Sequence, residues 1–190
     1  MSTEPRTLIT VISGTNRPGS RTRSVAEATR RIYHDLDCEV WLIDLAAFAE
    51  GSFDPQAEPP GFKEIADLFV AAKGLVVVTP EESGEIPNIL KYFFSWIRQR
   101  VTLQVRPVCF IGLADEDSKE AAANPVDQLH ELFGGKKNGY IYPVRMLIPN
   151  AATRVREDGA IDESDLLKIH KHAEGFIGFC QRMRGQMGRF

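Results

Sequence analysis

The sequence has few cysteines, no long apolar run and only a small excess of negative charge, and each shortage excludes a class of protein. Its three cysteines, Cys38, Cys109 and Cys180, are odd in number and far apart, so they predict neither a disulfide framework nor a metal-binding pair. The net charge of −3 argues against a general affinity for nucleic acid. The apolar runs are far shorter than the roughly 20 residues of a membrane-spanning helix, and the first residues lack the pattern of a secretory signal. We therefore expect a cytoplasmic protein that uses neither nucleic acid nor a membrane as a partner.

The four histidines support neither a metal site nor nucleophilic catalysis. His170 and His172 are two residues apart and would face different sides of a helix. No Ser–His–Asp or Cys–His arrangement can be assembled from the ends of the predicted strands. We therefore expect no bound metal and no hydrolase activity.

What the chain does have is a regular alternation of apolar strands and amphipathic helices over 190 residues. Continuously apolar strands are typical of a parallel sheet covered by helices on both faces. Five such strands favour the order 2-1-3-4-5, which places a ligand crevice at the carboxyl ends of strands one and three. We predict one doubly wound α/β domain over residues 1–190, with strands at 7–13, 39–43, 75–79, 105–113 and 139–144, and helices at 20–36, 62–72, 86–98, 126–133 and 164–184.

Three segments between these elements read as loops. Residues 54–61 carry three prolines, and residues 150–162 are irregular, with a turn at Asp158 and Gly159. Asn124 and Pro125 have the pattern of an N-cap followed by proline at the first helical position, which makes 115–123 a loop.

The loop after the first predicted strand has the composition of a phosphate-binding site. Gly14 and Gly19 permit a tight turn, hydroxyl groups follow at Thr15, Ser20 and Thr22, and the next helix presents its positive end. This pattern is neither the triphosphate loop nor the dinucleotide fingerprint. Basic residues gather along the loop and helix, which favours a small anion; they are Arg17, Arg21, Arg23, Arg30 and Arg31. The alternative is an N-cap serine among solvent-exposed arginines.

This loop resembles that of the NADPH-dependent FMN reductase family, whose flavodoxin-like members carry G-S-x-R-x-x-S-x-N at this place. Gly14, Arg17 and Ser20 match the pattern, while Thr15 and Thr22 stand where the family has Ser and Asn. Both replacements keep a side chain that can hydrogen-bond to phosphate.

The segment 79–91 resembles a second motif of the family, P-E-Y-N-G-S-x-P-x-x-L-K. The residues in register are Pro80, Glu81, Gly84, Pro87, Leu90 and Lys91. The resemblance implies that the main chain of 80–84 lies against the flavin ring. The family's Tyr, Asn and Ser are replaced here by Glu82, Ser83 and Glu85, which introduces two carboxylates. If these carboxylates approach the ring, they would lower the flavin's reduction potential or repel the phosphates of NADPH. The alternative is that both point to solvent.

The third family loop, which approaches the flavin pyrimidine edge, would begin at Leu113 and Ala114. Gly112 and Ala114 allow a close main-chain approach, but the acidic run at 115–117 departs from the family's glycine- and serine-rich sequence. The helix after the second motif carries Phe93, Phe94 and Trp96, which its apolar stripe predicts to be core or interface residues.

The resemblance implies an FMN-dependent oxidoreductase that takes hydride from NADPH or NADH and passes electrons to a small acceptor such as a quinone, a flavin, an azo compound or a metal oxyanion. It also implies a homodimer or homotetramer, with Trp96 and the region of Leu103 as interface candidates. No catalytic acid or base is expected. Two alternatives stay open, namely a flavodoxin-like electron carrier and a flavin-free interaction protein with a degenerate site. The expected cofactor-binding residues are Thr15, Arg17, Ser20, Arg21, Thr22, Pro80, Glu81, Glu82, Ser83, Gly84, Leu113 and Ala114.

Overall fold

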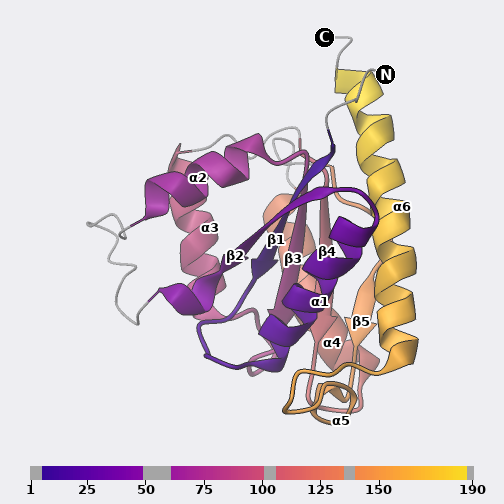
Figure 1. Cartoon of the computed structure of the whole chain (residues 1–190). Coiled ribbons are helices and arrows are strands. Elements are labelled where there is room, and N and C mark those ends of the chain that lie inside the picture. Colours follow the sequence, from indigo (N-terminus) through magenta and orange to yellow (C-terminus); the bar gives the residue numbers. More distant parts are fainter. Residues whose placement is uncertain (1–5, 49–60, 101–105, 135–139, 188–190) are drawn as a thin grey trace.

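A parallel sheet of five strands forms the centre of the computed structural model, which describes residues 6–48, 61–100, 106–134 and 140–187 (Figure 1). The strand order is β2-β1-β3-β4-β5, and every neighbouring pair is parallel. This confirms the order predicted from the sequence. The strands are β1 (Leu8–Ser13), β2 (Glu39–Asp44), β3 (Gly74–Pro80), β4 (Val108–Leu113) and β5 (Met146–Ile148).

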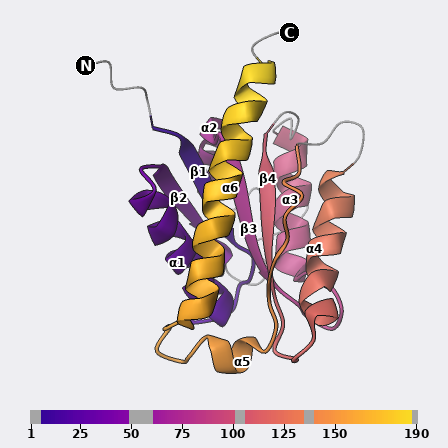
Figure 2. The same ribbon diagram turned by 90° about the vertical axis from the view of Figure 1, so that its right-hand side faces the viewer.

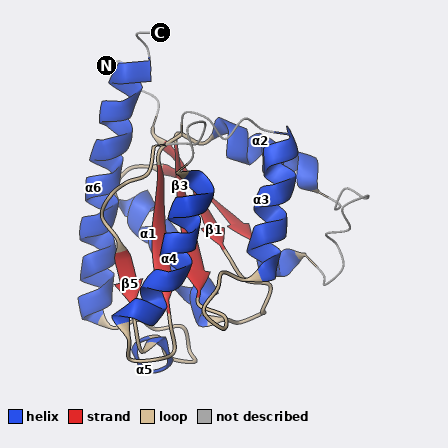
Figure 3. Cartoon of the chain, turned by 180° about the vertical axis from the view of Figure 1, so that it is seen from behind, coloured by secondary structure: helices blue, strands red, loops and turns tan. Residues whose placement is uncertain are grey.

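Helices cover both faces of the sheet. Helices α1 and α6 lie on one face, and α2, α3 and α4 lie on the other, as the front, side and rear views show (Figures 1, 2 and 3). The described helices are α1 (Arg21–Asp35), the short 3₁₀ helix η1 (Leu45–Ala47), α2 (Phe62–Ala71), α3 (Asn88–Arg100), α4 (Lys119–Phe133), α5 (Ala151–Arg154) and α6 (Glu163–Met187). Residues 54–60 of the predicted loop 54–61 and the region of Leu103 lie outside the described residues.

The face under α2, α3 and α4 is rich in aromatic rings. Phe93 and Phe94 are fully buried, and Trp96 exposes 6% of its surface and meets Phe62 edge to face at a centroid distance of 5.5 Å. Edge-to-face ring pairs add to the stabilisation that apolar burial provides. The aromatic residues of α3 are therefore core residues, and Tyr92, which is half exposed, is the large aromatic that α3 presents at the surface.

The face under α1 and α6 contains all three cysteines as free thiols. Cys109 in β4 and Cys180 in α6 are fully buried. Burial raises the pKa of Cys109 well above its usual value and raises the pKa of Cys180 to about 12. Because the thiolate is the reactive form of cysteine, these side chains act as apolar packing groups.

Helix α4 begins at Lys119, so the predicted start at Val126 is wrong. Ser118, not Asn124, is the N-cap, since its hydroxyl accepts a hydrogen bond from the amide of Ala121 at 3.1 Å. Pro125 lies inside the helix, where it removes one backbone hydrogen bond. The alanine-rich turn before it has high helix propensity, and packing of the helix against β4 holds it across the proline.

The last strand also differs from the prediction of 139–144. In the described part of that range, Ile141 forms one isolated bridge to Val108, and the regular pairing of β5 with β4 starts only at Met146. Pro143 lacks an amide proton and interrupts the ladder between these two contacts. The one-turn helix α5 falls within 150–162, and the predicted turn at Asp158 and Gly159 is confirmed, with a φ of 84° at Gly159.

None of the described helices is both long enough and apolar enough to cross a membrane. Within the same described ranges, no group of three or more His, Cys, Asp or Glu side chains is arranged to hold a metal ion.

Candidate functional site

The carboxyl ends of β1, β3 and β4 meet at one edge of the sheet. Ser13 pairs with Val78, and Pro80 pairs with Leu113, so the three strands end within a few residues of one another. The hydrogen bonding between β1 and β3 extends one residue beyond Ser13, because the amide of Gly14 donates to the carbonyl of Val78 at 2.8 Å. The loops after these strands therefore share one side of the molecule, where parallel sheets commonly bind ligands.

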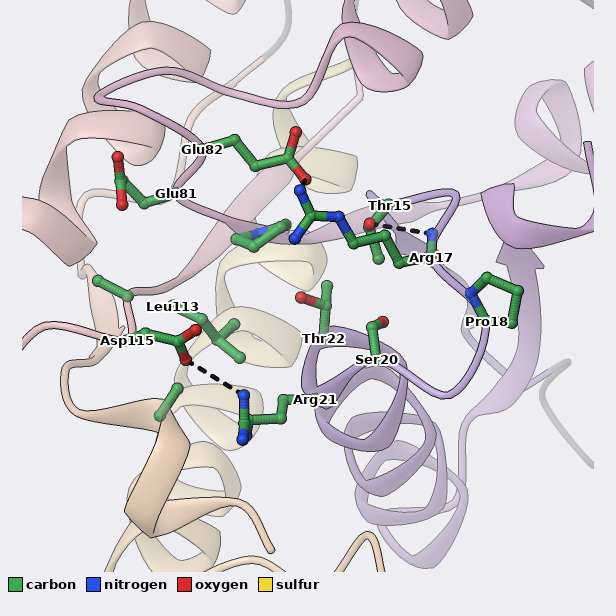
Figure 4. Close-up of a pocket in the computed structure, with 13 residues that line it drawn as sticks. Thr15, Arg17, Pro18, Ser20, Arg21, Thr22, Glu81, Glu82, Leu113 and Asp115 are labelled. Carbon is green, nitrogen blue, oxygen red and sulfur yellow. Dashed lines mark hydrogen bonds and ion pairs between the residues drawn. The ribbon is translucent and has the colours of Figure 1, made fainter. Parts of the chain in front are cut away.

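A cavity of about 260 Å³ opens between these loops (Figure 4). Ten of the twelve residues expected to bind a cofactor line it, while Ser83 and Gly84 do not. Pro18, Asp115 and Ala151 also line the cavity and were not among the expected residues. The lining residues are Thr15, Arg17, Pro18, Ser20, Arg21, Thr22, Pro80, Glu81, Glu82, Leu113, Ala114, Asp115 and Ala151.

One end of the cavity is rich in hydrogen-bond donors. Ser20 is the N-cap of α1, and its hydroxyl oxygen accepts from the amide of Arg23 at 3.2 Å. The first amides of a helix lack intrahelical acceptors, so those of Arg21 and Thr22 are placed to meet a ligand. Thr15 and Thr22 are almost completely buried, at 1% and 2% exposure, and both residues still line the cavity.

The arginines of this region separate into two groups. Arg17 and Arg21 line the cavity, while Arg23 pairs with Asp44 at 2.8 Å and Arg30 pairs with Glu27 at 2.9 Å. Ser20 is the N-cap that the alternative interpretation predicts, and it also lines the cavity, so the two interpretations of this loop do not exclude each other. A helix N-terminus, buried hydroxyl groups and two guanidinium groups together match the chemistry of a phosphate ester.

The loop after β3 forms the opposite wall as a tight hairpin. Glu82 and Glu85 exchange backbone hydrogen bonds at 2.9 and 3.1 Å, and Ser83 and Gly84 between them both have positive φ. A two-residue turn of this kind points its central residues outward, which explains why Ser83 and Gly84 do not reach the cavity. Their contribution is to shape the main chain at Glu81 and Glu82.

Gln128 of α4 anchors this hairpin, and the sequence analysis missed it. Its side-chain nitrogen donates to the carbonyl of Gly84 at 2.7 Å, and its side-chain oxygen accepts from the amide of Ile86 at 3.1 Å. The two residues it joins are more than forty positions away along the chain. Only the packing of α4 beside the loop reveals the contact.

The two glutamates that replace family residues in this loop behave differently. Glu85 forms an ion pair with Lys91 outside the cavity, and that pair lowers the pKa of its carboxyl group. Glu82 instead turns into the cavity, where its carboxylate lies 3.4 Å from the guanidinium group of Arg17 (Figure 4). The solvent-facing reading is therefore right for Glu85 and wrong for Glu82.

The loop after β4 supplies the rest of the wall. Leu113 and Ala114 each expose only 2% of their surface, and the amide of Glu81 donates to the carbonyl of Leu113 at 2.7 Å. Asp115 carries the first charge of the acidic run into the cavity, where it lies 3.5 Å from Arg21. The following acidic residues, Glu116 and Asp117, are exposed.

The cavity thus combines a donor-rich end with a wall formed by main chain and by the apolar side chains of Pro80, Leu113 and Ala114, to which Glu82 and Asp115 add two carboxylates. This combination suits a phosphate ester joined to a planar ring, which is the composition of FMN, because the phosphate needs directed donors and the ring needs a flat, largely apolar surface. The fold and the cavity together define a flavodoxin-like α/β protein with a donor-rich cavity at the switch point of its sheet.

Residues 7–150 of the chain match the sequence profile of a family described as NADPH-dependent FMN reductase. Because this match covers most of the chain, the protein belongs to that family.

Solved structures agree on the fold. The chain is similar to an NADH:FMN oxidoreductase in its apo form, with 18% identity, a TM-score of 0.71 and coverage of 90% of this chain and 88% of that one. It is also similar to a flavoenzyme NAD(P)H:(acceptor) oxidoreductase from Paracoccus denitrificans, with 16% identity, a TM-score of 0.71 and coverage of 93% and 98%. A mutant flavodoxin from Pseudomonas aeruginosa matches with 17% identity, a TM-score of 0.62 and coverage of 89% and 98%.

Proposed function

We propose that this chain is a flavoenzyme that binds FMN in the cavity at the ends of β1, β3 and β4, takes hydride from NADPH or NADH and passes electrons to a small acceptor. The observation that carries the proposal is the convergence of ten expected residues on one cavity whose donor-rich end suits a phosphate. Membership of the FMN reductase family supports the reaction class.

The residues that line the cavity contact different parts of FMN, depending on their position. The helix N-terminus and the polar side chains at its end of the cavity hold the phosphate; these side chains are Thr15, Arg17, Ser20, Arg21 and Thr22. The ring side is bounded by Pro80, Glu81, Glu82, Leu113 and Ala114, while Ser83 and Gly84 fix the hairpin from outside. When bound, FMN supplies the ability to accept hydride and release electrons, so the protein needs no acid or base of its own.

We also propose an acceptor class, a domain extent, a cellular location and an oligomeric state. The acceptor is a small molecule of the quinone, flavin, azo or metal oxyanion class, and the chain acts as one FMN-binding domain over residues 1–190. The protein is cytoplasmic and works as a homodimer or homotetramer without nucleic acid or membrane partners. Trp96 packs within the protomer, which favours the exposed part of α3 around Tyr92 over Trp96 as a subunit contact.

One observation favours a second candidate, a flavin-free interaction protein. Both arginines that line the cavity already have a carboxylate partner, since Arg17 meets Glu82 and Arg21 meets Asp115. Such pairs reduce the charge offered to a phosphate. A flavodoxin-like carrier, which would bind FMN without accepting hydride from NAD(P)H, is the remaining alternative.

The consumption of NADPH and of NADH with a quinone as acceptor, measured in the presence and absence of added FMN, tests the reductase. We expect consumption that depends on FMN and that falls in Thr22→Val, because this change removes a buried hydroxyl group from the cavity while keeping the side chain's shape. Thr29→Val is the matched control: Thr29 is buried on the same helix, and its hydroxyl donates to the carbonyl of Val25 at 2.7 Å, away from the cavity. FMN-independent consumption, or equal losses in both variants, would count against the proposal.

A further inference from the structure

The ion pair between Arg17 and Glu82 bridges the loops after β1 and β3 across the mouth of the cavity. Its closest atoms are 3.4 Å apart, and the side chains are 74% and 29% exposed, respectively. The neighbouring carboxylates of the same loop are directed elsewhere, because Glu81 accepts a hydrogen bond from the amide of Gly84 and Glu85 pairs with Lys91. Glu82 is thus the acidic side chain of the hairpin that Arg17 holds (Figure 4).

The same pair lies on the boundary of a second cavity. That cavity has a volume of about 570 Å³, and Arg17, Pro18 and Glu82 line both spaces. The remaining lining of the second cavity combines amide and apolar side chains, namely Asn16, Ala46, Phe48, Pro87, Asn88 and Ile89. A movement of Arg17 toward the donor-rich end of the first cavity would break the pair at the point where the two spaces adjoin.

A carboxylate and a phosphate cannot both use one guanidinium group in full. The phosphate dianion offers more charge and more acceptor oxygens, so it is the stronger partner. The carboxylate is already in place, however, and after displacement it stays close enough to repel the dianion. Because the side chain of Arg17 is mostly exposed, solvent weakens the pair enough for it to be displaced.

We propose that Glu82 is an internal competitor for Arg17, so that it lowers the affinity of this site for phosphate-bearing ligands and closes the boundary between the two cavities when no such ligand is bound. The inference rests on the proposed FMN site and adds an affinity-determining residue to it. The affinity of the protein for the phosphate group is therefore lower than the donors at the end of α1 alone would give. As a result, FMN exchanges with solution more readily.

The test compares the binding of FMN and of riboflavin, which lacks the phosphate, by flavin fluorescence in the native protein and in Glu82→Gln. We expect Glu82→Gln to bind FMN about five-fold more tightly, the scale of one exposed ion pair, and to bind riboflavin with unchanged affinity. Glu85→Gln is the matched control, because it removes the same charge from the same loop outside the cavity. Equal FMN affinity in native protein and Glu82→Gln, or an equal gain in Glu85→Gln, would overturn the proposal.

A second readout separates this inference from the FMN site itself. Inorganic phosphate is titrated into ¹⁵N-labelled protein while the Nε–H resonance of Arg17 is followed by NMR. If Glu82 competes for Arg17, phosphate shifts this resonance at several-fold lower concentration in Glu82→Gln, even if the protein binds no flavin. Identical titrations in the two proteins would contradict the competition, whereas failure of FMN to bind, with the phosphate result intact, would contradict only the proposed function.

Discussion

Arg17 is the side chain on which the proposed phosphate site depends most. It lines the cavity with its guanidinium group, and its amide donates to the hydroxyl oxygen of Thr15 at 3.3 Å, which ties the loop to the buried threonine. Two later arginines of the same basic segment, Arg23 and Arg30, are held by carboxylates outside the cavity. The charge available to a ligand therefore comes from a small part of a strongly basic segment.

Replacing Arg17 by Ala removes a charged hydrogen-bond donor and leaves Glu82 without its partner. We expect FMN affinity to fall by roughly 1.5–3 kcal/mol, the usual cost of a lost charged hydrogen bond. A fluorescence titration of the variant measures the loss. Arg30→Ala serves as control, because Arg30 lies on the helix that follows this loop and pairs with Glu27; unaltered FMN affinity in Arg17→Ala would refute the assigned role.

The contact between β4 and α4 decides where the third loop lies. Gly112 packs so closely against the helix that an added Cβ atom would lie 2.1 Å from the carbonyl oxygen of Ala122 and 2.8 Å from a methyl group of Val126. Both neighbours belong to packed structure that cannot yield without moving α4. The close approach also sets the position of Leu113 and Ala114, which follow Gly112 into the cavity wall.

Gly112→Ala should therefore destabilise the fold by about 1–3 kcal/mol, the range found for overpacked sites. Urea unfolding followed by circular dichroism measures the change as a lower transition midpoint. Gly178→Ala on α6 is the comparison, because an added Cβ atom there comes no nearer than 3.4 Å to Arg182, and alanine is the better helix former. Equal midpoints for both variants would show that β4 and α4 are not in close contact.

Elements with a strong apolar pattern could be predicted from the sequence, whereas elements that contain or adjoin a proline were predicted at the wrong positions. β1, β3 and α1 end within one or two residues of their predicted bounds because continuous apolar runs and a serine N-cap mark them. The predicted start of α4 was wrong because Asn124 and Pro125 have the pattern of a helix start. The last strand was predicted too early, over 139–144, because Pro143 was not recognised as an interruption of the pairing. In the fold, Ser118 caps α4 ahead of Pro125, and β5 resumes its pairing beyond Pro143.

Site residues could be predicted where a motif and a strand end coincide, as at Thr15, Ser20 and Pro80. The pairing of Glu82 with Arg17 could not, because the two residues come from separate loops and either could equally have faced water. Asp115 and Gln128 were missed for the same reason. Their roles follow from which loops the parallel sheet brings together, and single-sequence patterns do not carry that information.

The free energy of unfolding of the whole molecule depends on pH through His172. It is buried on α6, exposes 5% of its surface and has its Nε2 atom 3.0 Å from the carbonyl oxygen of Val144. Burial lowers the pKa of His172 below its ordinary value. The hydrogen bond to Val144 acts in the opposite direction, but the effect of burial is the larger of the two.

Because the folded state holds His172 neutral, the unfolded chain binds the proton more readily. The resulting stability is present above the ordinary histidine pKa of about 6.5 and is lost as the pH falls below it. We expect the melting temperature to drop between pH 7 and pH 5 by more in the native protein than in His172→Gln, whose amide can still donate to Val144. His170→Gln, at a partly exposed position two residues away, should follow the native protein; parallel curves for native protein and His172→Gln would contradict the assignment.

The most direct test of the whole account is the absorbance spectrum of the purified protein with added FMN, after removal of unbound flavin, recorded anaerobically before and after addition of NADPH or NADH. The account predicts a retained flavin band that bleaches when the reduced nicotinamide is added. A retained band that does not bleach would leave an electron carrier, and a protein that retains no flavin and shows no change in the flavin spectrum on mixing would contradict the central claim.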